Sequence, residues 1–270
     1  MSKKLSVSRV SLYRKKTKID ARDKVLLPVI KQIMSKNPSY GHRRVAIALK
    51  LNKKRTLRIM RKFNLKPAKR RPRRPIKLND FNNPATIYKN LVKNICPITP
   101  HVIWSSDFTY IPFKDSFVYL ACVTDVFTRV IVGWTISVKH TSDFVLEALQ
   151  DAVIRTNKTP QILHSDQGSE YTSQKYLSFA EKKEIKISMS RKSSPWENGY
   201  QESFFATFKL ELGDPGRFKT LGELTEAIHI TINYYNRNRI HSKLKMSPYQ
   251  YYLNYLKKFN LESLFQIWGT

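Results

Sequence analysis

Two aspartates and a glutamate fall where secondary-structure elements would hold them rigidly. Asp107 lies within an expected strand at 101–113, and Asp166 lies at the exit of an expected strand at 161–164. Carboxylates are rare in buried strands unless they serve a site, and ligand sites of open α/β sheets favour strand ends. A third carboxylate would complete an oxygen-rich site suited to Mg²⁺ or Mn²⁺ rather than to zinc. Two such ions can clamp an in-line phosphoryl displacement.

Two glutamates compete for the third position. Ser194-Pro195-Trp196-Glu197 has the form of a capping box with proline at the first helical position, which gives Glu197 a structural task. Glu202 lies deeper in the expected helix, on a face shared with Asn198, Phe205 and Lys209. Nothing local explains a carboxylate on that partly aromatic face. We therefore favour Glu202 and treat Asn198 as a supporting residue.

The expected elements around these residues form one mixed core over residues 95–255. Composition and turn residues predict strands at 101–113, 117–127, 130–138, 161–164 and 185–189, and helices at 141–156, 173–183 and up to Gly213. Short turns between the first three strands indicate an antiparallel meander. The order β-β-β-α-β-α-β-α predicts a mixed α/β layer fold, followed by a tail at 256–270.

Positive charge is concentrated ahead of this core. The chain carries 49 Lys and Arg against 20 Asp and Glu, and 27 of these cations but only three acids fall in residues 1–80. Such a block favours a polyanion such as nucleic acid, although a solvated tail, a ribosome or a membrane surface would suit the same composition. Two cysteines exclude a disulfide framework, and no apolar run reaches the roughly 18 residues of a membrane span. The N-terminus lacks the apolar stretch of a signal peptide, so we expect a cytoplasmic protein without a membrane partner.

The first 65 residues are expected to form a small helical DNA-binding domain. Apolar spacing predicts helices at 22–36, 42–51 and 53–63, with Pro28 kinking or shortening the first. In the third helix the cations share an arc of about 120°, opposite an apolar face. The members of this cationic arc are Lys54, Arg55, Arg58, Arg61 and Lys62. This arc suits a helix laid against DNA, and the alternative is a solvated face. The Pro-rich basic stretch within 66–94 is expected to be a linker.

Several sequence words carry a family resemblance when they are taken together. They are WSSDFTYI around Asp107, HSDQGSEYTS around Asp166, SMSRKSSPWENGYQESFFATFK around Glu202, NYYNRNRIHSKLKMSPYQYY at 233–252 and YGHRRVAIAL at 40–49. Asp166 and Glu202 are separated by 35 residues. The chain resembles the retroviral-integrase-like transposases of insertion sequences whose catalytic core is encoded by a second reading frame (OrfB). Gln167 and Glu170 depart from the family pattern, which usually has Arg and Gln there.

This resemblance implies a ribonuclease-H-like fold and a transposase that nicks donor ends and transfers strands. It implies that Asp107 bridges two Mg²⁺ or Mn²⁺ ions, with Asp166 and Glu202 on one ion each. Lys209, two helical turns past Glu202, is a candidate for a phosphate beside the scissile bond. His164 would orient Asp166 or touch DNA, or would equally be a packed histidine. A C-terminal basic patch of Asn236, Arg237, Arg239 and His241 is a further expected DNA contact.

The expected partners are the terminal inverted repeats and target DNA, a second copy of the chain on DNA, and the first-frame product by fusion or assembly. We expect a bacterial, nucleoid-associated location. Two other functions share this fold: a structure-specific nuclease or resolvase, and a DNA-binding regulator with an inactive core. The three intact carboxylates argue against the regulator.

Overall fold

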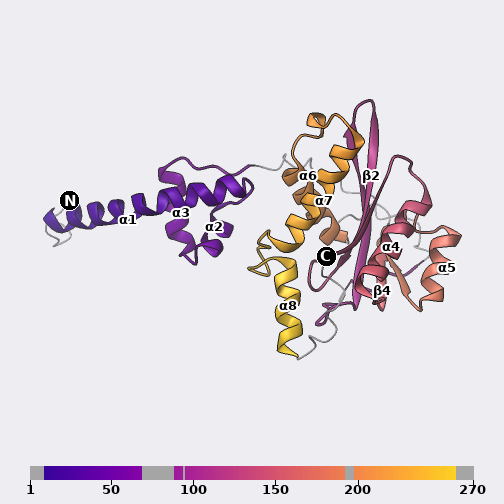
Figure 1. The fold of residues 1–270 in the computed structure, drawn as a ribbon. Coiled ribbons are helices and arrows are strands. Elements are labelled where there is room, and N and C mark those ends of the chain that lie inside the picture. Colours follow the sequence, from indigo (N-terminus) through magenta and orange to yellow (C-terminus); the bar gives the residue numbers. More distant parts are fainter. Residues whose placement is uncertain (1–8, 69–87, 94, 192–197, 260–270) are drawn as a thin grey trace. The chain divides into compact units, whose positions relative to one another are not determined.

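The chain divides into two structural units. The computed structural model describes residues 9–68, 88–93, 95–191 and 198–259, with side chains from residue 21 onward. One unit comprises Met1–Lys69 with Ile240–Lys245, and the other comprises Arg70–Arg239 with Met246–Thr270. The first unit is helical, and the second contains the sheet and the two aspartates (Figure 1).

The helical unit consists of α1 (Arg9–Lys36), α2 (His42–Ala48) and α3 (Lys53–Lys62). Asn52 caps α3, because its side chain accepts a hydrogen bond from the amide of Lys54 at 2.8 Å. The buried members of its core are Ile30, Tyr40, Val45, Ile59 and Met60. Segment Ile240–Lys245 completes the unit: the Ile240 amide donates to the Tyr40 hydroxyl at 2.7 Å, and the Ile240 carbonyl accepts from Arg44 Nε at 3.0 Å.

The first helix is longer than the sequence suggested. It begins at Arg9 rather than near residue 22, and it continues through Pro28. Pro28 and Lys24 are both exposed, so the carbonyl that the proline leaves without a helical donor can be hydrated. The expectation that Pro28 shortens the helix was therefore wrong.

The second unit is built on a five-stranded mixed sheet with the order β3-β2-β1-β4-β5. The strands are β1 (Ile103–Phe113), β2 (Ser116–Asp125), β3 (Ile131–Ser137), β4 (Ile162–Ser165) and β5 (Lys186–Met189). The first three pair antiparallel through short turns, and β4 and β5 are parallel to β1. The predicted mixed sheet with an antiparallel meander is confirmed.

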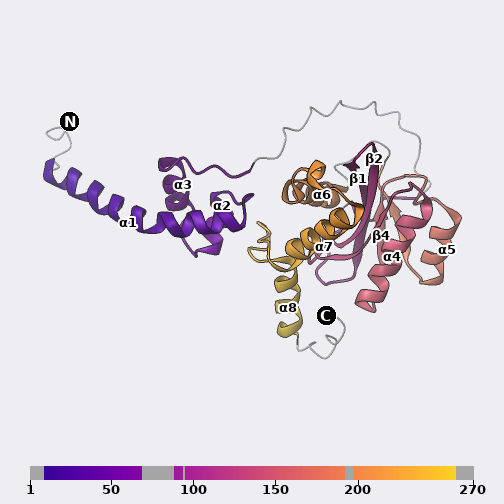
Figure 2. The ribbon, with the colours of Figure 1, turned by 45° about the horizontal axis from the view of Figure 1, so that its top comes forward.

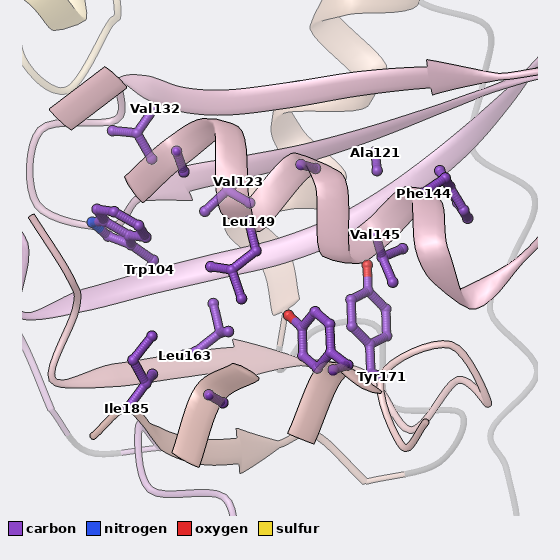
Figure 3. Packing of buried hydrophobic residues seen from close by; sticks show 14 of the residues in the cluster. Trp104, Ala121, Val123, Val132, Phe144, Val145, Leu149, Leu163, Tyr171 and Ile185 are labelled. Atoms are coloured by element: carbon purple, nitrogen blue, oxygen red, sulfur yellow. The ribbon is translucent and has the colours of Figure 1, made fainter. Parts of the chain in front are cut away.

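Helices cover both faces of this sheet (Figure 2). On one face lie α4 (Ser142–Thr156) and α5 (Gln174–Lys182), packed on Trp104, Val123 and Leu163 (Figure 3). On the other lie α6 (Gly199–Leu212) and α7 (Leu221–Arg237), while α8 (Pro248–Lys258) follows and the 3₁₀ turn Pro215–Arg217 joins α6 to α7. Gly133 lets α4 approach β3, since a Cβ there would lie 2.4 Å from the Ala152 amide nitrogen.

The described part of α6 begins at Gly199, with Asn198 as its N-cap residue. The predicted capping box at 194–197, including Glu197, lies outside the described residues. Within the described ranges, no helix is both long enough and apolar enough to span a membrane.

Candidate active site

Asp107 is held at the middle of the sheet by β1. It pairs with Cys122 of β2, and its Oδ1 accepts a hydrogen bond from the amide of Phe108 at 2.8 Å. The two serines before it are buried, and Ser106 Oγ lies 3.5 Å from the hydroxyl of the buried Tyr171. The backbone that carries Asp107 is therefore fixed on both sides.

Asp166 directly follows β4, at the same level along the sheet as Asp107 on β1. The parallel register places Ser105 opposite His164, so Asp107 and Asp166 each lie two residues beyond a paired position. Adjacent strands run roughly 4.8 Å apart. Asp166 is exposed, and its Oδ1 accepts from the amide of Gly168 at 2.9 Å. The sheet thus brings the two aspartates to neighbouring positions at the carboxyl end of β4.

Glu202 enters from α6, which is tethered to β1 and β2 by neutral side chains. Asn198 Oδ1 accepts from Ser105 Oγ at 2.5 Å, and its Nδ2 donates to the Ser106 carbonyl at 3.4 Å. Gln201 is fully buried and donates to the carbonyls of Ser105 and Cys122. These bonds fix the first turn of α6 over the residues just before Asp107. Asn198, which the sequence analysis treats as a supporting residue, thus lies at the start of α6 and is bonded to β1.

The carboxylates influence one another electrostatically. Burial, the charge of Asp166 and, less strongly, the charge of Glu202 raise the pKa of Asp107 to about 7, against the lowering effect of the Phe108 amide. Burial also raises the pKa of Asp166, with a further increase from the charge of Glu170, while the Gly168 amide lowers it. Charge on any of these groups thus disfavours charge on its neighbours.

This donor set suits a hard divalent cation. Carboxylate oxygens are preferred ligands of Mg²⁺ and Mn²⁺, and a dication compensates for the burial and the repulsion between carboxylates that raise the pKa values of Asp107 and Asp166. Among the described residues, no three His, Cys, Asp or Glu side chains are gathered closely enough to hold an ion as they stand. The register of β1 and β4 brings the backbone positions of Asp107 and Asp166 close to one another.

His164 is a packed histidine rather than an exposed one. It is 2% exposed, and its Nδ1 lies 2.9 Å from Ser188 Oγ on the adjacent strand β5. The hydroxyl of Ser188 also accepts from the amide of Leu91 at 2.9 Å. Of the roles considered for His164, this burial removes direct contact with DNA.

Lys209 is exposed on α6, with its Nζ 5.0 Å from the centre of the Tyr110 ring on β1. Partial burial lowers the pKa of its ammonium group. A lysine on the same helix as Glu202 and beside β1 remains a candidate for a phosphate of a bound strand.

Two members of the cationic arc of α3 are paired with an acid. Arg58 donates three hydrogen bonds to the buried carboxylate of Asp23, the shortest at 2.9 Å, and Arg55 lies 3.6 Å from the same group. Lys54, Arg61 and Lys62 are exposed. Sequence periodicity missed this pairing because Asp23 lies 35 residues before Arg58.

The expected C-terminal basic patch is also divided. Arg239 is 2% exposed, and its Nε donates to Glu211 Oε1 at 2.7 Å, so its guanidinium is not presented to a ligand. Asn236 is buried and bonds to the backbone of Ile131. Arg237 is exposed, with its Cζ 4.9 Å from the centre of the Tyr249 ring. The prediction of Arg239 as a DNA contact conflicts with this burial, whereas Arg237 stays a candidate.

The mixed sheet and its helical layers have the fold of retroviral integrase cores. A chain in the cryo-EM structure of a simian T-cell lymphotropic virus intasome in complex with PP2A regulatory subunit B56 gamma superimposes with a TM-score of 0.53. The match is 16% identical in sequence and covers 83% of this chain and 74% of that one. The ribonuclease-H-like fold expected from the sequence is confirmed.

Sequence comparison then gives the family. Two models of the integrase core domain match residues 98–195 and 183–248. The putative transposase InsK of IS150 from Escherichia coli strain K12 is 30% identical over 78% of this chain and 77% of its own length. The transposase of IS904 from Lactococcus lactis is 41% identical over 57% of this chain and 62% of its own, so the chain spans less than two thirds of that relative. The chain belongs to the insertion-sequence transposases with an integrase core domain.

Sequence reasoning missed two features beside the aspartates. Gln201 was not singled out, because the residue types on either side of it give no signal for a buried tether. Glu170 was noted only as a departure from the family. It is 7% exposed, and its Oε1 lies 2.6 Å from Nε2 of His140, so a fourth carboxylate lies near Asp166.

Proposed function

We propose that this chain catalyses donor-end nicking and strand transfer during transposition, with two Mg²⁺ or Mn²⁺ ions held by Asp107, Asp166 and Glu202. The observation that carries the proposal is electrostatic: Asp107 is influenced by the charges of both Asp166 and Glu202, although the three come from β1, the end of β4 and α6. Bound divalent ions supply the positive charge that activates a nucleophilic oxygen and stabilises the leaving oxygen.

The chain's own residues position the reacting groups. In nicking, a water oxygen forms a bond to the scissile phosphorus as the bond to the 3′-oxygen breaks, leaving a 3′-hydroxyl and a 5′-phosphate. In strand transfer, that 3′-hydroxyl attacks a target phosphodiester, whose own 3′-oxygen leaves. The tethers from Asn198 and Gln201 hold the first turn of α6 to β1, so Glu202 approaches a rigid strand rather than a loop. Lys209 is proposed to hold a phosphate of the same strand.

The DNA is proposed to be the element's terminal repeats and then a target duplex. A net charge of +29, concentrated in the first 80 residues, supports binding to DNA through counterion release. We propose that residues 1–65 form the DNA-binding domain, that 66–94 link it to the core, and that the active species is an oligomer on DNA. Assembly with a first-frame product is part of the same proposal.

A matched pair of substitutions tests the site. Glu202→Gln keeps the size of the side chain but removes a ligand charge, so nicking and joining should both fall by on the order of 10³-fold or more. Glu197→Gln is the control, and its activity should stay near wild type, because in the capping box that the sequence predicts a glutamine would keep most of the hydrogen bonding. The assay incubates labelled duplexes carrying the element's ends with Mg²⁺ and resolves 3′-end nicks from joined products.

The products also separate the other two functions. Nicks without any joined strand from the wild-type chain would identify a nuclease or resolvase. Specific binding with neither product would identify a regulator. Loss of cleavage in Glu197→Gln with retention in Glu202→Gln would refute the choice of the third carboxylate.

A further inference from the structure

Arg129 lies in a rigid turn between β2 and β3. It has a left-handed backbone, with φ at 67°, and its amide donates to the carbonyl of Asp125 at 2.8 Å. The side chain of Asp125 locks the same turn, because its Oδ1 accepts from both the amide and the hydroxyl of Thr128 at 2.7 Å. The direction in which the Arg129 side chain leaves the backbone is therefore fixed by the turn.

Two nitrogens of the Arg129 guanidinium are buried with no acceptor among the residues that the structure describes. The residue is 7% exposed, and no described residue accepts a hydrogen bond from its Nε or Nη1, both of which are buried. Its Cζ lies 3.9 Å from the centre of the Tyr200 ring, so one face of the guanidinium is stacked. Buried arginines are normally paired, because an unpaired buried charge is strongly destabilising.

We propose that Arg129 forms a binding site for a backbone phosphate of DNA, with Tyr200 as its cover. A guanidinium stacked on one face still presents an edge of N–H groups, and this edge matches a phosphate in two-point geometry. Tyr200 lies in the first turn of the 14-residue helix α6, where unpaired amides favour an anion. The inference deepens the proposed function by adding a phosphate contact to the same core.

The position of the turn fits a strand that also reaches the carboxylates. Asp125 pairs with Trp104, and Asp107 lies three residues further along β1, which corresponds to roughly 10 Å. A phosphate on Arg129 and a phosphate at the carboxylates would therefore lie close enough together to belong to one DNA strand. Tyr200 is 45% exposed, so its ring can move outward to admit that phosphate.

The decisive experiment compares Arg129→Gln with Arg155→Gln. Both remove one positive charge from the core, but Arg155 is on α4, which packs on the other face of the sheet, and is paired with Asp151 at 2.7 Å. Binding of a fluorescein-labelled duplex of arbitrary sequence to the full chain is followed by anisotropy in EDTA across a salt series. Thermal unfolding of each DNA-free variant is measured alongside.

Arg129→Gln should weaken binding roughly tenfold or more and reduce the log–log salt slope by about 0.9, the value for one phosphate contact. The free protein should be as stable as wild type or more stable, because an unpaired buried charge has been removed. Arg155→Gln should change the slope much less. Tyr200→Ala should bind DNA at least as tightly as wild type, because the cover is gone.

Two results would overturn the proposal. One is an equal change of slope in Arg129→Gln and Arg155→Gln, and the other is a less stable free protein with an unchanged slope, which would make Arg129 a structural residue. If Arg129→Gln does not fold, Arg129→Lys is used instead, because it keeps the charge. Weaker DNA binding with an unchanged salt slope supports the site, and wild-type affinity rejects it. Because binding is measured without metal, a failure here is distinguishable from a failure of wild-type nicking and joining.

Discussion

Replacing Asp107 by asparagine should stabilise the metal-free core at alkaline pH. The pKa of Asp107 is raised from 3.8 to about 7, first by burial and then by the charge of Asp166. The native state therefore keeps a proton that the unfolded chain releases near pH 4, and the stability from this group is present below that pH. It is lost as the pH rises through about 7. A shift of about three pKa units at 1.36 kcal/mol each corresponds to about 4 kcal/mol, an upper value for one relaxing carboxyl.

The expected result is a difference that depends on pH. Asparagine cannot ionise and still offers Oδ1 to the Phe108 amide, so Asp107→Asn should match wild type at pH 4.5 and exceed it by up to about 4 kcal/mol at pH 8.5. Mn²⁺ should shrink this difference at alkaline pH, because only the wild-type site gains from the ion. At a free ion concentration 100 times the Kd this gain is about 2.7 kcal/mol.

The measurement is urea unfolding in EDTA, followed by tryptophan fluorescence from pH 4.5 to 8.5. All four tryptophans belong to the unit that contains the sheet, and Trp104 is fully buried there, so the signal reports on the core. Asp115→Asn, in the exposed turn between β1 and β2, is a control with the same change of charge. A stability difference between Asp107→Asn and wild type that stays constant across this range would refute the reasoning.

Further expectations concern the charges around the site and on α3. The charge of Glu170 raises the pKa of Asp166, so Glu170→Gln should move the pH of half-maximal Mn²⁺ binding to a lower value. Calorimetry at several pH values would measure this shift, and its absence would show that the two groups do not interact. Replacing Lys54 and Arg61 together by glutamine should reduce the salt slope of DNA affinity by about 1.8, and an unchanged slope would leave them as solvated charges. Arg58→Gln should instead lower the stability of the helical unit by about 1–3 kcal/mol, because the buried carboxylate of Asp23 loses the three hydrogen bonds that Arg58 donates. Circular dichroism on heating would measure this loss.

Much of the core could be predicted because its elements are determined locally. Three strands joined by two short turns can pair only as an antiparallel meander, and apolar spacing located α4 and α5 to within a residue or two. The start of α1 was missed because a helix can extend without an apolar stripe. The continuation through Pro28 depended on solvent access to one carbonyl, which spacing does not reveal.

The sequence draws attention to the carboxylates of the candidate site but not to the side chains that tether α6. Asp107 and Asp166 stand out because strands rarely carry carboxylates without a task. Gln201 bonds to carbonyls 96 and 79 residues away in the chain, and no local pattern encodes such partners. The same distance in sequence hid the pairing of Arg239 with Glu211 across 28 residues. Charge and periodicity identify which residues share a helix face, whereas the tertiary fold determines which acid pairs with each cation.

The partners of the two aspartates explain why a metal ion suits them. The chain has a net charge of +29, and three acids elsewhere, Asp23, Asp151 and Glu211, are paired with arginine. Within the described ranges, no lysine or arginine forms an ion pair with Asp107 or Asp166, whose hydrogen bonds come from backbone amides instead. An amide occupies one of the roughly four lone-pair positions of a carboxylate and brings no net charge. A divalent cation can occupy the remaining lone-pair positions and offset the repulsion between the carboxylates. The burial of Asp107 that lowers the stability of the metal-free core therefore also favours metal binding.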